Sequence, residues 1–291
     1  MVSFSIFDLA IIFFFFAIVL LIGFLAGRNN NNEKGSDDYM LYGRKTGLFL
    51  FILTNVSTWY GGILGVGEFT YRYGIASWFT QGFPYYIFAF LFALLLAGKI
   101  RKAQLYTIPD KIQEVYGKTA GLLSAIIVFV LVSPAPYLLM TANLLSLIFK
   151  ISIIPSLIAA LLLSLLYLFK GGYKSDLYTD AFQFFVMFGG FIAVFLISWF
   201  NVGDFNYLAA NLPAKHLQLT GGASPVYILV WFLIALWTFA DPGFHQRCYA
   251  AKSSNVAVKG ILISIILWCI LVEYGKQTFL ILQSVSNYTR V

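Results

Sequence analysis

The amino-acid sequence predicts an all-α integral membrane protein with about eight transmembrane helices. Hydrophobic residues make up 60% of the 291 residues and charged residues only 11%, and the mean hydropathy is +0.84. Soluble domains carry roughly 25% charged residues. Apolar runs long enough to cross a bilayer recur along the chain and are separated by short polar segments. The 30 Phe and 18 Tyr residues suit surfaces that face lipid and its interfaces.

The apolar runs define the expected spans in order. The first has too long an apolar core, and no basic region before it, to be a cleaved signal peptide. Pro134 and Pro136 predict a kink in the fourth span. The eight predicted spans are residues 6–27, 46–73, 77–98, 120–149, 153–169, 178–200, 225–240 and 261–272.

The basic residues predict the orientation. The net charge of +7 comes from short clusters between apolar runs, a distribution that argues against a nucleic-acid partner and for a lipid bilayer. With eight spans, 14 of the 19 Lys and Arg residues fall on one side, which the positive-inside rule makes cytoplasmic. We expect a multi-pass plasma-membrane protein whose N-terminus is outside and whose first loop is cytoplasmic. The 14 residues are Arg28, Lys34, Arg44, Lys45, Lys99, Arg101, Lys102, Lys111, Lys118, Lys170, Lys174, Arg247, Lys252 and Lys259.

The second predicted span, residues 46–73, has an unusual middle. Glycine costs about 1 kcal/mol in a helix interior, so the glycines there predict local unwinding. Unwound backbone at membrane depth lines cavities and builds the sites of secondary transporters. Alternatively, Gly61 and Gly65 form a G-x-x-x-G face that packs closely on a neighbouring helix. The residues that interrupt or follow the apolar run are Asn55, Ser57, Thr58, Gly61, Gly62, Gly65, Gly67, Glu68 and Arg72.

Enzyme and transition-metal chemistry have no visible support. The two cysteines, Cys248 and Cys269, have neither disulfide-framework nor metal-binding spacing. The two histidines, His216 and His245, have no acidic or thiol companion at ligand spacing. A nucleophile elbow, a phosphate loop and a zinc motif are all missing from the sequence. We therefore expect neither an enzyme nor a cofactor.

Four short motifs stand at boundaries of the predicted spans. They are DYMLYGR at residues 38–44 with Gly47, TIPD at 107–110 with Tyr116 and Gly117, GG at 171–172 with Thr179, Asp180 and Gln183, and QR at 246–247 with AAK at 250–252 and Ala257. Together, and in this order, they resemble the sodium:solute symporter family, which includes sodium/proline, sodium/pantothenate and sodium/sugar symporters. The resemblance covers roughly residues 37–260.

The resemblance implies a single transporter domain, residues 1–291, with the leucine-transporter-like fold of two inverted five-helix repeats. Residues 1–27 would be an additional first helix, 46–200 the complete first repeat, and 225–272 the start of the second. Residues 273–291 form a tail without resemblance to the family. Because family members need both repeats, we expect a chain that is incomplete at its C-terminus, either a fragment or a truly short product.

The resemblance also implies sodium ligands at the break in the second span. Two backbone carbonyls three residues apart would hold sodium there, either Ser57 with Tyr60 or Val56 with Trp59. Carbonyl and hydroxyl oxygens suit a hard cation.

Substrate contacts are expected at the same break and at the end of the seventh span. Thr58 lies between either pair of carbonyls, and Gly61 and Gly62 allow a ligand close to the backbone. The resemblance makes Trp237 and Thr238 part of the second discontinuous core helix, where aromatic residues form a wall of the substrate cavity. An interfacial aromatic belt is the alternative for Trp237.

Asp180 is the acid that we single out. By resemblance it is a carboxylate near the sodium site on the cytoplasmic side, and carboxylates within a membrane are expensive and usually functional. The alternative is a hydrated charge in the first turn of its helix, favoured by the helix dipole.

The function that the resemblance implies is secondary active transport: sodium:solute symport of a small organic solute across the plasma membrane by alternating access. Sodium would be the coupling ion, with no other cofactor. One alternative is a transporter-like sensory membrane domain, which a following kinase segment would reveal. Another is a non-functional truncated remnant.

Overall fold

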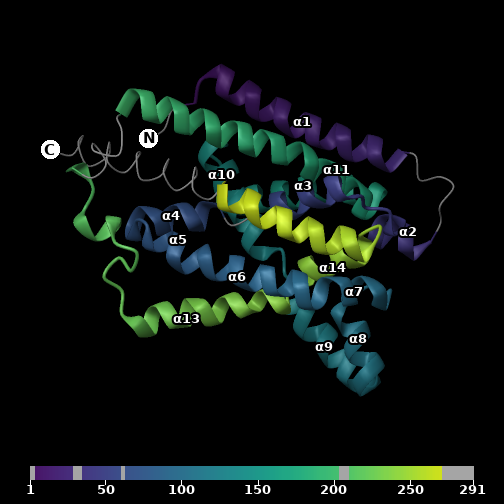
Figure 1. Cartoon of the computed structure of the whole chain (residues 1–291). Helices are drawn as coiled ribbons and strands as arrows, with labels where there is room; N and C mark the ends of the chain where they lie inside the picture. Colours follow the sequence, from purple (N-terminus) through teal and green to yellow (C-terminus); the bar gives the residue numbers. More distant parts are fainter. Residues whose placement is uncertain (1–3, 29–34, 60–62, 203–209, 271–291) are drawn as a thin grey trace.

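The computed structural model describes residues 4–28, 35–59, 63–202 and 210–270, and every regular element in these ranges is a helix (Figure 1). Within these ranges, five helices are long and apolar enough to cross a membrane, and three shorter apolar helices accompany them. Each of these helices overlaps one predicted span, several with different bounds, and the number of membrane crossings stays a prediction. The five long helices are Ile6–Arg28, Ala76–Ala103, Lys118–Phe149, Gly171–Phe200 and Pro225–Ala250, and the shorter ones are Leu48–Thr58, Ile153–Leu166 and Ser254–Ile270.

The predicted break in the second span separates two helices in the structure. Helix α3 (Leu48–Trp59) ends at Trp59, and helix α4 (Ile63–Tyr73) begins at Ile63. Residues 60–62, which include the candidate site residues Tyr60, Gly61 and Gly62, lie outside the described residues. Glu68 and Arg72 of α4 lie one helical turn apart and form an ion pair, with Arg72 Nη2 2.7 Å from Glu68 Oε1.

Helix α11 (Ile153–Val202) consists of two helices that meet at a kink at Gly172, so the segment expected as a loop between the fifth and sixth spans is helical apart from this kink. The chain bends at Gly172, whose φ of 54° and ψ of −147° are accessible to glycine alone. A Cβ atom at Gly172 would lie 2.5 Å from the carbonyl oxygen of Tyr39 in helix α2 (Ser36–Leu41). The bend therefore also lets α2 approach the α11 backbone.

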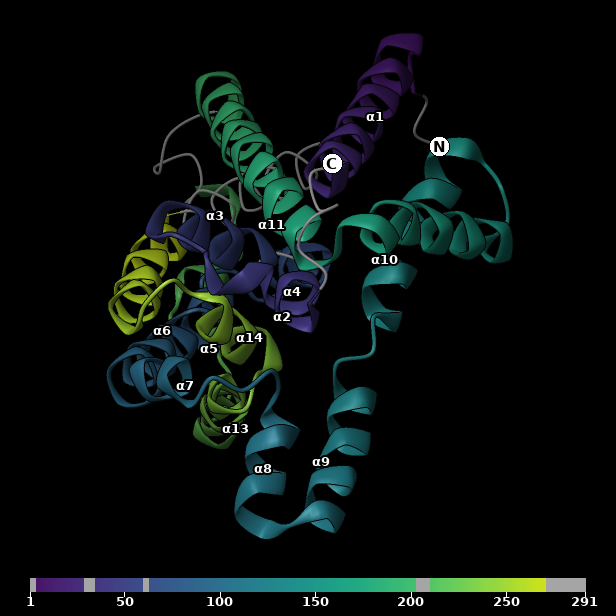
Figure 2. The same ribbon diagram turned by 90° about the vertical axis from the view of Figure 1, so that its right-hand side faces the viewer.

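Helix α1 (Ile6–Arg28) lies alongside α11, as Figures 1 and 2 show. The Ser175 hydroxyl of α11 donates a hydrogen bond to the Gly23 carbonyl oxygen at 2.6 Å. The outer face of α1 carries large exposed apolar side chains, among them Phe13 and Phe14. A helix that is apolar towards both protein and surroundings is typical of a lipid-facing transmembrane segment.

Helix α3 lies in the core. Phe51 and Val56 are fully buried, and they share one apolar cluster with Leu177 of α11. The last described helix, residues 254–270, adds Ile261 and Trp268 to this cluster. The packing is close, because a Cβ atom at Gly260 would lie 2.3 Å from the Phe51 ring.

The third and fourth predicted spans appear with interruptions. The kink predicted from Pro134 and Pro136 is confirmed, since α9 ends at Leu131 and α10 begins at Ala135. Figure 2 shows α8 and α9 as a hairpin that projects from the rest of the described protein. The bounds are α5 (Ala76–Gln81), α6 (Phe83–Phe92), the π-helical turn η3 (Ala93–Ala97), α7 (Gly98–Ala103), α8 (Ile108–Tyr116), α9 (Lys118–Leu131) and α10 (Ala135–Phe149).

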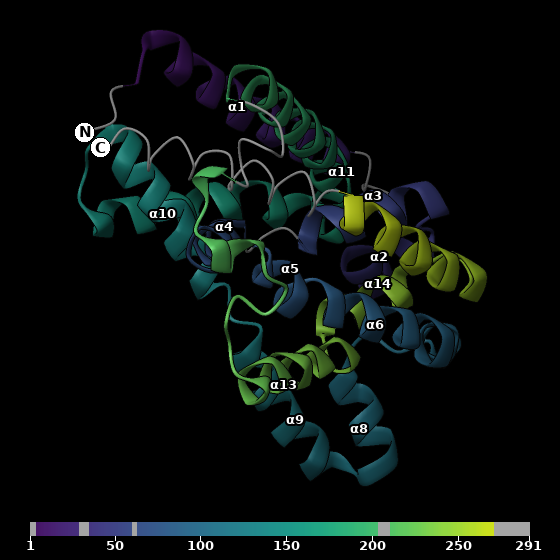
Figure 3. The same ribbon diagram turned by 60° about the vertical axis from the view of Figure 1, so that its left-hand side comes forward.

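The seventh span is discontinuous. Helix α13 (Pro225–Ala235) lies beside α5 and α6 (Figure 3) and ends in a 3₁₀ turn, η5 (Leu236–Phe239). Helix α14 (Pro242–Ala250) follows, with the Asp241 side chain capping its first turn. The segment left between the seventh and eighth predicted spans, residues 241–260, was expected to be a loop, but most of it is helical, and the eighth apolar helix begins at residue 254 instead of 261. A second 3₁₀ turn, η4 (Ala214–Leu217), precedes α13.

Candidate functional site

Thr58, in the last turn of α3, contacts Asp180, so two candidate site residues lie side by side. Its Oγ1 lies 3.0 Å from Asp180 Oδ2 on α11 and 2.9 Å from the Thr54 carbonyl oxygen. Both neighbours are acceptors, so the single hydroxyl hydrogen is shared between them. The structure thus brings the end of α3 against the acid that the sequence singled out.

Asp180 is positioned by the middle of α11, not by a helix start. It lies eight residues after the bend at Gly172, about two helical turns. The prediction that it occupies a first turn was therefore wrong. Its side chain is 13% exposed, so hydration alone does not balance its charge.

Arg247 of α14 contacts both Asp180 and Thr58. Its side chain is 7% exposed, and its Nη2 lies 3.6 Å from Asp180 Oδ2 and contacts Thr58 Oγ1. Its Nη1 donates to the Gly243 carbonyl oxygen at 3.1 Å within α14. We call Thr58, Asp180 and Arg247 the α3–α11–α14 triad.

Sequence reasoning missed the role of Arg247. It placed this residue in a cytoplasmic loop, because residues 241–260 were expected to be irregular. The only available signal was the QR motif at 246–247, which says nothing about what the guanidinium contacts. The pairing of Arg247 with Asp180 depends on the packing of α14 against α3 and α11, which a local pattern does not show.

The remaining candidate residues have different surroundings. Val56 is fully buried and Ser57 is half-buried, both one turn or less from the end of α3. Trp59 ends α3, and its side chain lies outside the described part of the structure. In η5, Trp237 is half-buried, and Thr238 is 1% exposed with no hydrogen-bond partner for its Oγ1 among the described residues.

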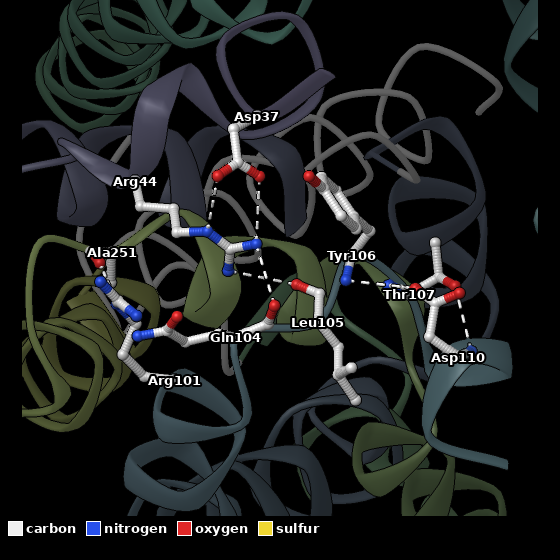
Figure 4. A network of polar contacts seen from close by, with 9 residues as sticks. All are labelled: Asp37, Arg44, Arg101, Gln104, Leu105, Tyr106, Thr107, Asp110 and Ala251. Carbon is white, nitrogen blue, oxygen red and sulfur yellow. Dashed lines mark hydrogen bonds and ion pairs between the residues drawn. The ribbon is translucent and has the colours of Figure 1, made fainter. Parts of the chain in front are cut away.

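A second polar cluster joins Arg44 of the first motif to Asp37 and to the segment that precedes the TIPD motif (Figure 4). Arg44, whose side chain is 12% exposed, forms a two-pronged contact with Asp37: Nε to Oδ2 at 3.4 Å and Nη2 to Oδ1 at 3.2 Å. The same guanidinium donates to the carbonyl oxygens of Leu105 at 3.2 Å and Gln104 at 3.1 Å. The segment before α3 is therefore fastened to the chain that follows α7. We call this the Arg44 cluster.

The fourth motif joins the same region through the backbone. The Thr46 N–H donates to the Ala250 carbonyl at 3.2 Å, and the Lys252 N–H donates to the Thr46 carbonyl at 2.8 Å. Arg101 also donates from Nε to the Ala251 carbonyl oxygen (Figure 4). The start of α3 and the C-terminal ends of α7 and α14 therefore meet at this place.

Tyr106 and the start of α8 border the Arg44 cluster. The Thr107 N–H donates to Asp110 Oδ2 at 2.8 Å, and the Asp110 N–H donates to Thr107 Oγ1 at 3.4 Å, which is a capping box. Figure 4 shows Tyr106 between this cap and Asp37. A hydrogen bond from Tyr106 and the Arg44 guanidinium lower the pKa of the Asp37 carboxyl, while the bond to Asp37 raises the pKa of the Tyr106 hydroxyl.

The donor chemistry near the triad suits a hard cation. Among the described residues, no group of three or more His, Cys, Asp or Glu side chains is placed to hold a metal ion. The oxygens available at the end of α3 are instead a hydroxyl, a carboxylate and main-chain carbonyls. Such mixed oxygen ligands are those of hard cations, and they leave softer metals without their preferred nitrogen and sulfur ligands.

Comparisons with known proteins agree with this arrangement. The model of the sodium:solute symporter family matches residues 39–284. The high affinity choline transporter 1 of Homo sapiens is 29% identical over 237 residues, which cover 77% of this chain and 40% of the transporter. The high-affinity choline transporter 1 of Drosophila melanogaster is 29% identical over 232 residues, covering 76% of this chain and 36% of the transporter. The chain thus spans about two fifths of the length of these relatives.

A solved structure is similar along the whole chain. A Na⁺-coupled sialic acid symporter in a substrate-bound outward-open state superposes with a TM-score of 0.81 at 17% sequence identity, covering 99% of this chain and 62% of that one. At this identity the likeness concerns the fold, and it confirms the leucine-transporter-like fold implied by the sequence motifs. With a family model that matches most of its length, the chain belongs to the sodium:solute symporter family.

Proposed function

We propose that this chain carries part or all of a sodium-coupled symporter that moves a small organic solute across the plasma membrane by alternating access. The observation that carries the proposal is the position of Thr58. It lies in the last turn of α3 and contacts Asp180 and the Thr54 carbonyl oxygen, so hydroxyl, carboxylate and carbonyl oxygens converge at one place. The family and the relatives are sodium-coupled or choline transporters, which supports transport and not catalysis.

The proposed sodium ligands are those at the end of α3. Thr58 Oγ1 and the Asp180 carboxylate are within hydrogen-bonding distance of each other at 3.0 Å, which is close enough for both to contact one ion. The carbonyls of Val56 and Trp59, or of Ser57 and Tyr60, would supply further oxygens. Sodium would then neutralise a carboxylate that is costly to keep charged away from water.

The proposed solute site lies between the break and η5. Phe239 of η5 lies 5.9 Å from Phe88 and 6.4 Å from Phe92, measured between ring centroids. Aromatic faces attract cations, especially quaternary ammonium groups. Since the relatives are named choline transporters, we propose an organic cation as the solute and choline as the first compound to test. Thr58, Gly61, Gly62, Trp237 and Thr238 remain our candidates for contacts to this solute.

Transport in proteoliposomes tests this proposal. The chain is reconstituted, and uptake of labelled choline and of labelled sialic acid is followed with an inward Na⁺ gradient or an equal K⁺ gradient. We expect choline uptake that requires Na⁺ and is lost in Asp180→Asn. Glu68→Gln is the matched control, since this acid is 64% exposed and pairs only with Arg72 in the described structure. Equal uptake with K⁺ would refute sodium coupling, and uptake of sialic acid alone would refute the proposed solute.

A further inference from the structure

The acidic side of the triad holds more than one carboxylate. Asp176 lies four residues before Asp180, so both project from the same face of α11. Arg247 attracts both carboxylates electrostatically, and it interacts more weakly with Asp241 at the start of α14. Like charges one turn apart destabilise a helix, all the more where water is scarce. A compensating positive charge is therefore required here.

Arg247 supplies only part of that charge. Two carboxylates of α11 interact electrostatically with one guanidinium, so when both are ionised the pair carries one negative charge more than Arg247 balances. The nearby Tyr173 and Cys248 side chains are uncharged and buried, and the Tyr173 hydroxyl has no hydrogen-bond partner in the described structure. Arg247 Nε is likewise buried without a partner there. The polar groups at this place are thus incompletely satisfied as well as unbalanced in charge.

Burial and hydrogen bonds hold the Arg247 side chain beside Asp176 and Asp180. Its residue exposure is 6%, its Nη1 is bonded to the Gly243 carbonyl, and its Nη2 contacts Thr58 and Asp180. Its neighbours along α14, Phe244 and Cys248, are buried. A mobile cation would therefore bind beside this guanidinium instead of replacing it.

We propose that Arg247 is a fixed counter-cation of the Asp176–Asp180 pair, and that its charge sets how tightly this place holds one monovalent cation. Arg247 is a positioning residue in this scheme, because it acts on the ion through the two carboxylates. With Arg247 present, one cation brings the pair and the guanidinium to neutrality. This inference rests on the proposed sodium coupling, and it adds a residue to which neither the sequence nor the comparisons assign a role.

The test compares sodium binding by the wild type with binding by variants that remove the charge of Arg247, of Asp176 or of both. The full chain in lipid nanodiscs is unfolded thermally, followed by tryptophan fluorescence, over a series of NaCl concentrations with KCl keeping the ionic strength constant. The half-saturating Na⁺ concentration is read from the shift of the midpoint. The variants are Arg247→Gln, Arg247→Lys, Asp176→Asn and the double variant Asp176→Asn/Arg247→Gln. Arg101→Gln is the control for losing a partly buried arginine that bonds a backbone carbonyl.

If Arg247 acts as a fixed positive charge, Arg247→Gln and Asp176→Asn should shift the half-saturating Na⁺ concentration in opposite directions. Loss of a unit positive charge 3.6 Å from Asp180 should lower the half-saturating Na⁺ concentration of Arg247→Gln at least about tenfold. Asp176→Asn should raise it about tenfold. The double variant has the same net charge as the wild type, so its half-saturating Na⁺ concentration should lie within about threefold of the wild-type value. The half-saturating concentrations of Arg247→Lys and Arg101→Gln should stay near that of the wild type.

The outcomes separate this inference from the proposed function. If the wild type and every variant respond equally to NaCl and KCl, sodium coupling itself is wrong, and the role of Arg247 fails with it. If the wild type responds to Na⁺ but Arg247→Gln weakens the response or leaves it unchanged, only the role of Arg247 is overturned. Should Arg247→Gln not fold, Asp176→Asn decides, because an unchanged half-saturating concentration contradicts the charge balance.

Discussion

Replacement of Gly172 by alanine tests whether the bend in α11 organises the site. The backbone of Gly172, with φ 54° and ψ −147°, is one that residues with a Cβ atom rarely adopt, at a cost of about 1–3 kcal/mol. The new Cβ would also lie 2.5 Å from the Tyr39 carbonyl oxygen. Forcing an extra methyl group into a packed site costs about 1–3 kcal/mol more. We therefore expect Gly172→Ala to lower the free energy of unfolding by about 2–6 kcal/mol.

Gly190→Ala is the matched control on the same helix. A Cβ atom at Gly190 would meet nothing within 4 Å, and the position is exposed on regular helix. Alanine favours the helix by about 1 kcal/mol over glycine, so this variant should be unchanged or slightly more stable. Thermal unfolding of both variants in nanodiscs, followed by tryptophan fluorescence, measures the difference. Equal midpoints for Gly172→Ala and Gly190→Ala would refute the reasoning, because the two changes are chemically identical and differ only in backbone and surroundings.

Two further predictions concern the two polar clusters. Thr58→Val removes the hydroxyl that lies 3.0 Å from Asp180 Oδ2, and loss of a hydrogen bond to a charged group costs about 1.5–3 kcal/mol. The half-saturating Na⁺ concentration for uptake should therefore rise roughly tenfold to a hundredfold, and an unchanged value would remove Thr58 from the sodium site. Asp37 has a pKa below its ordinary value near 3.8, because Tyr106 donates a hydrogen bond to it and Arg44 pairs with it. These contacts therefore stabilise the fold above that value and are lost as the pH falls below it. Thermal midpoints measured from pH 6 down to pH 3 should fall more steeply for the wild type than for Asp37→Asn, and parallel curves would contradict this.

The local sequence was sufficient for features that depend on one segment at a time. Apolar runs located the five long apolar helices of the described structure, because a helix in lipid satisfies its own backbone and needs only length and hydrophobicity. The proline pair located the end of α9, since proline cannot continue a helix interior. Helix α8 was not predicted, although the TIPD motif carries its start signal: Thr107 and Asp110 form a capping box at the first turn. The concentration of glycine located the boundary between α3 and α4.

Tertiary structure alone decided what the polar side chains contact. The sequence placed Arg44, Arg101 and Arg247 together as loop charges, yet Arg44 and Arg101 hold backbone carbonyls, whereas Arg247 is buried against Asp180. Composition cannot distinguish these roles, because each depends on helices that are distant in sequence. The helix α14 was missed for the same reason. Its polar residues are typical of a loop, and only its packing against other helices shows that several of them are buried. The sequence by itself determined that this is a membrane protein of helical spans with an interruption at the second. Packing of α3, α11 and α14 determined that Thr58, Asp180 and Arg247 meet, since an ion pair away from water forms only where the fold brings both charges together.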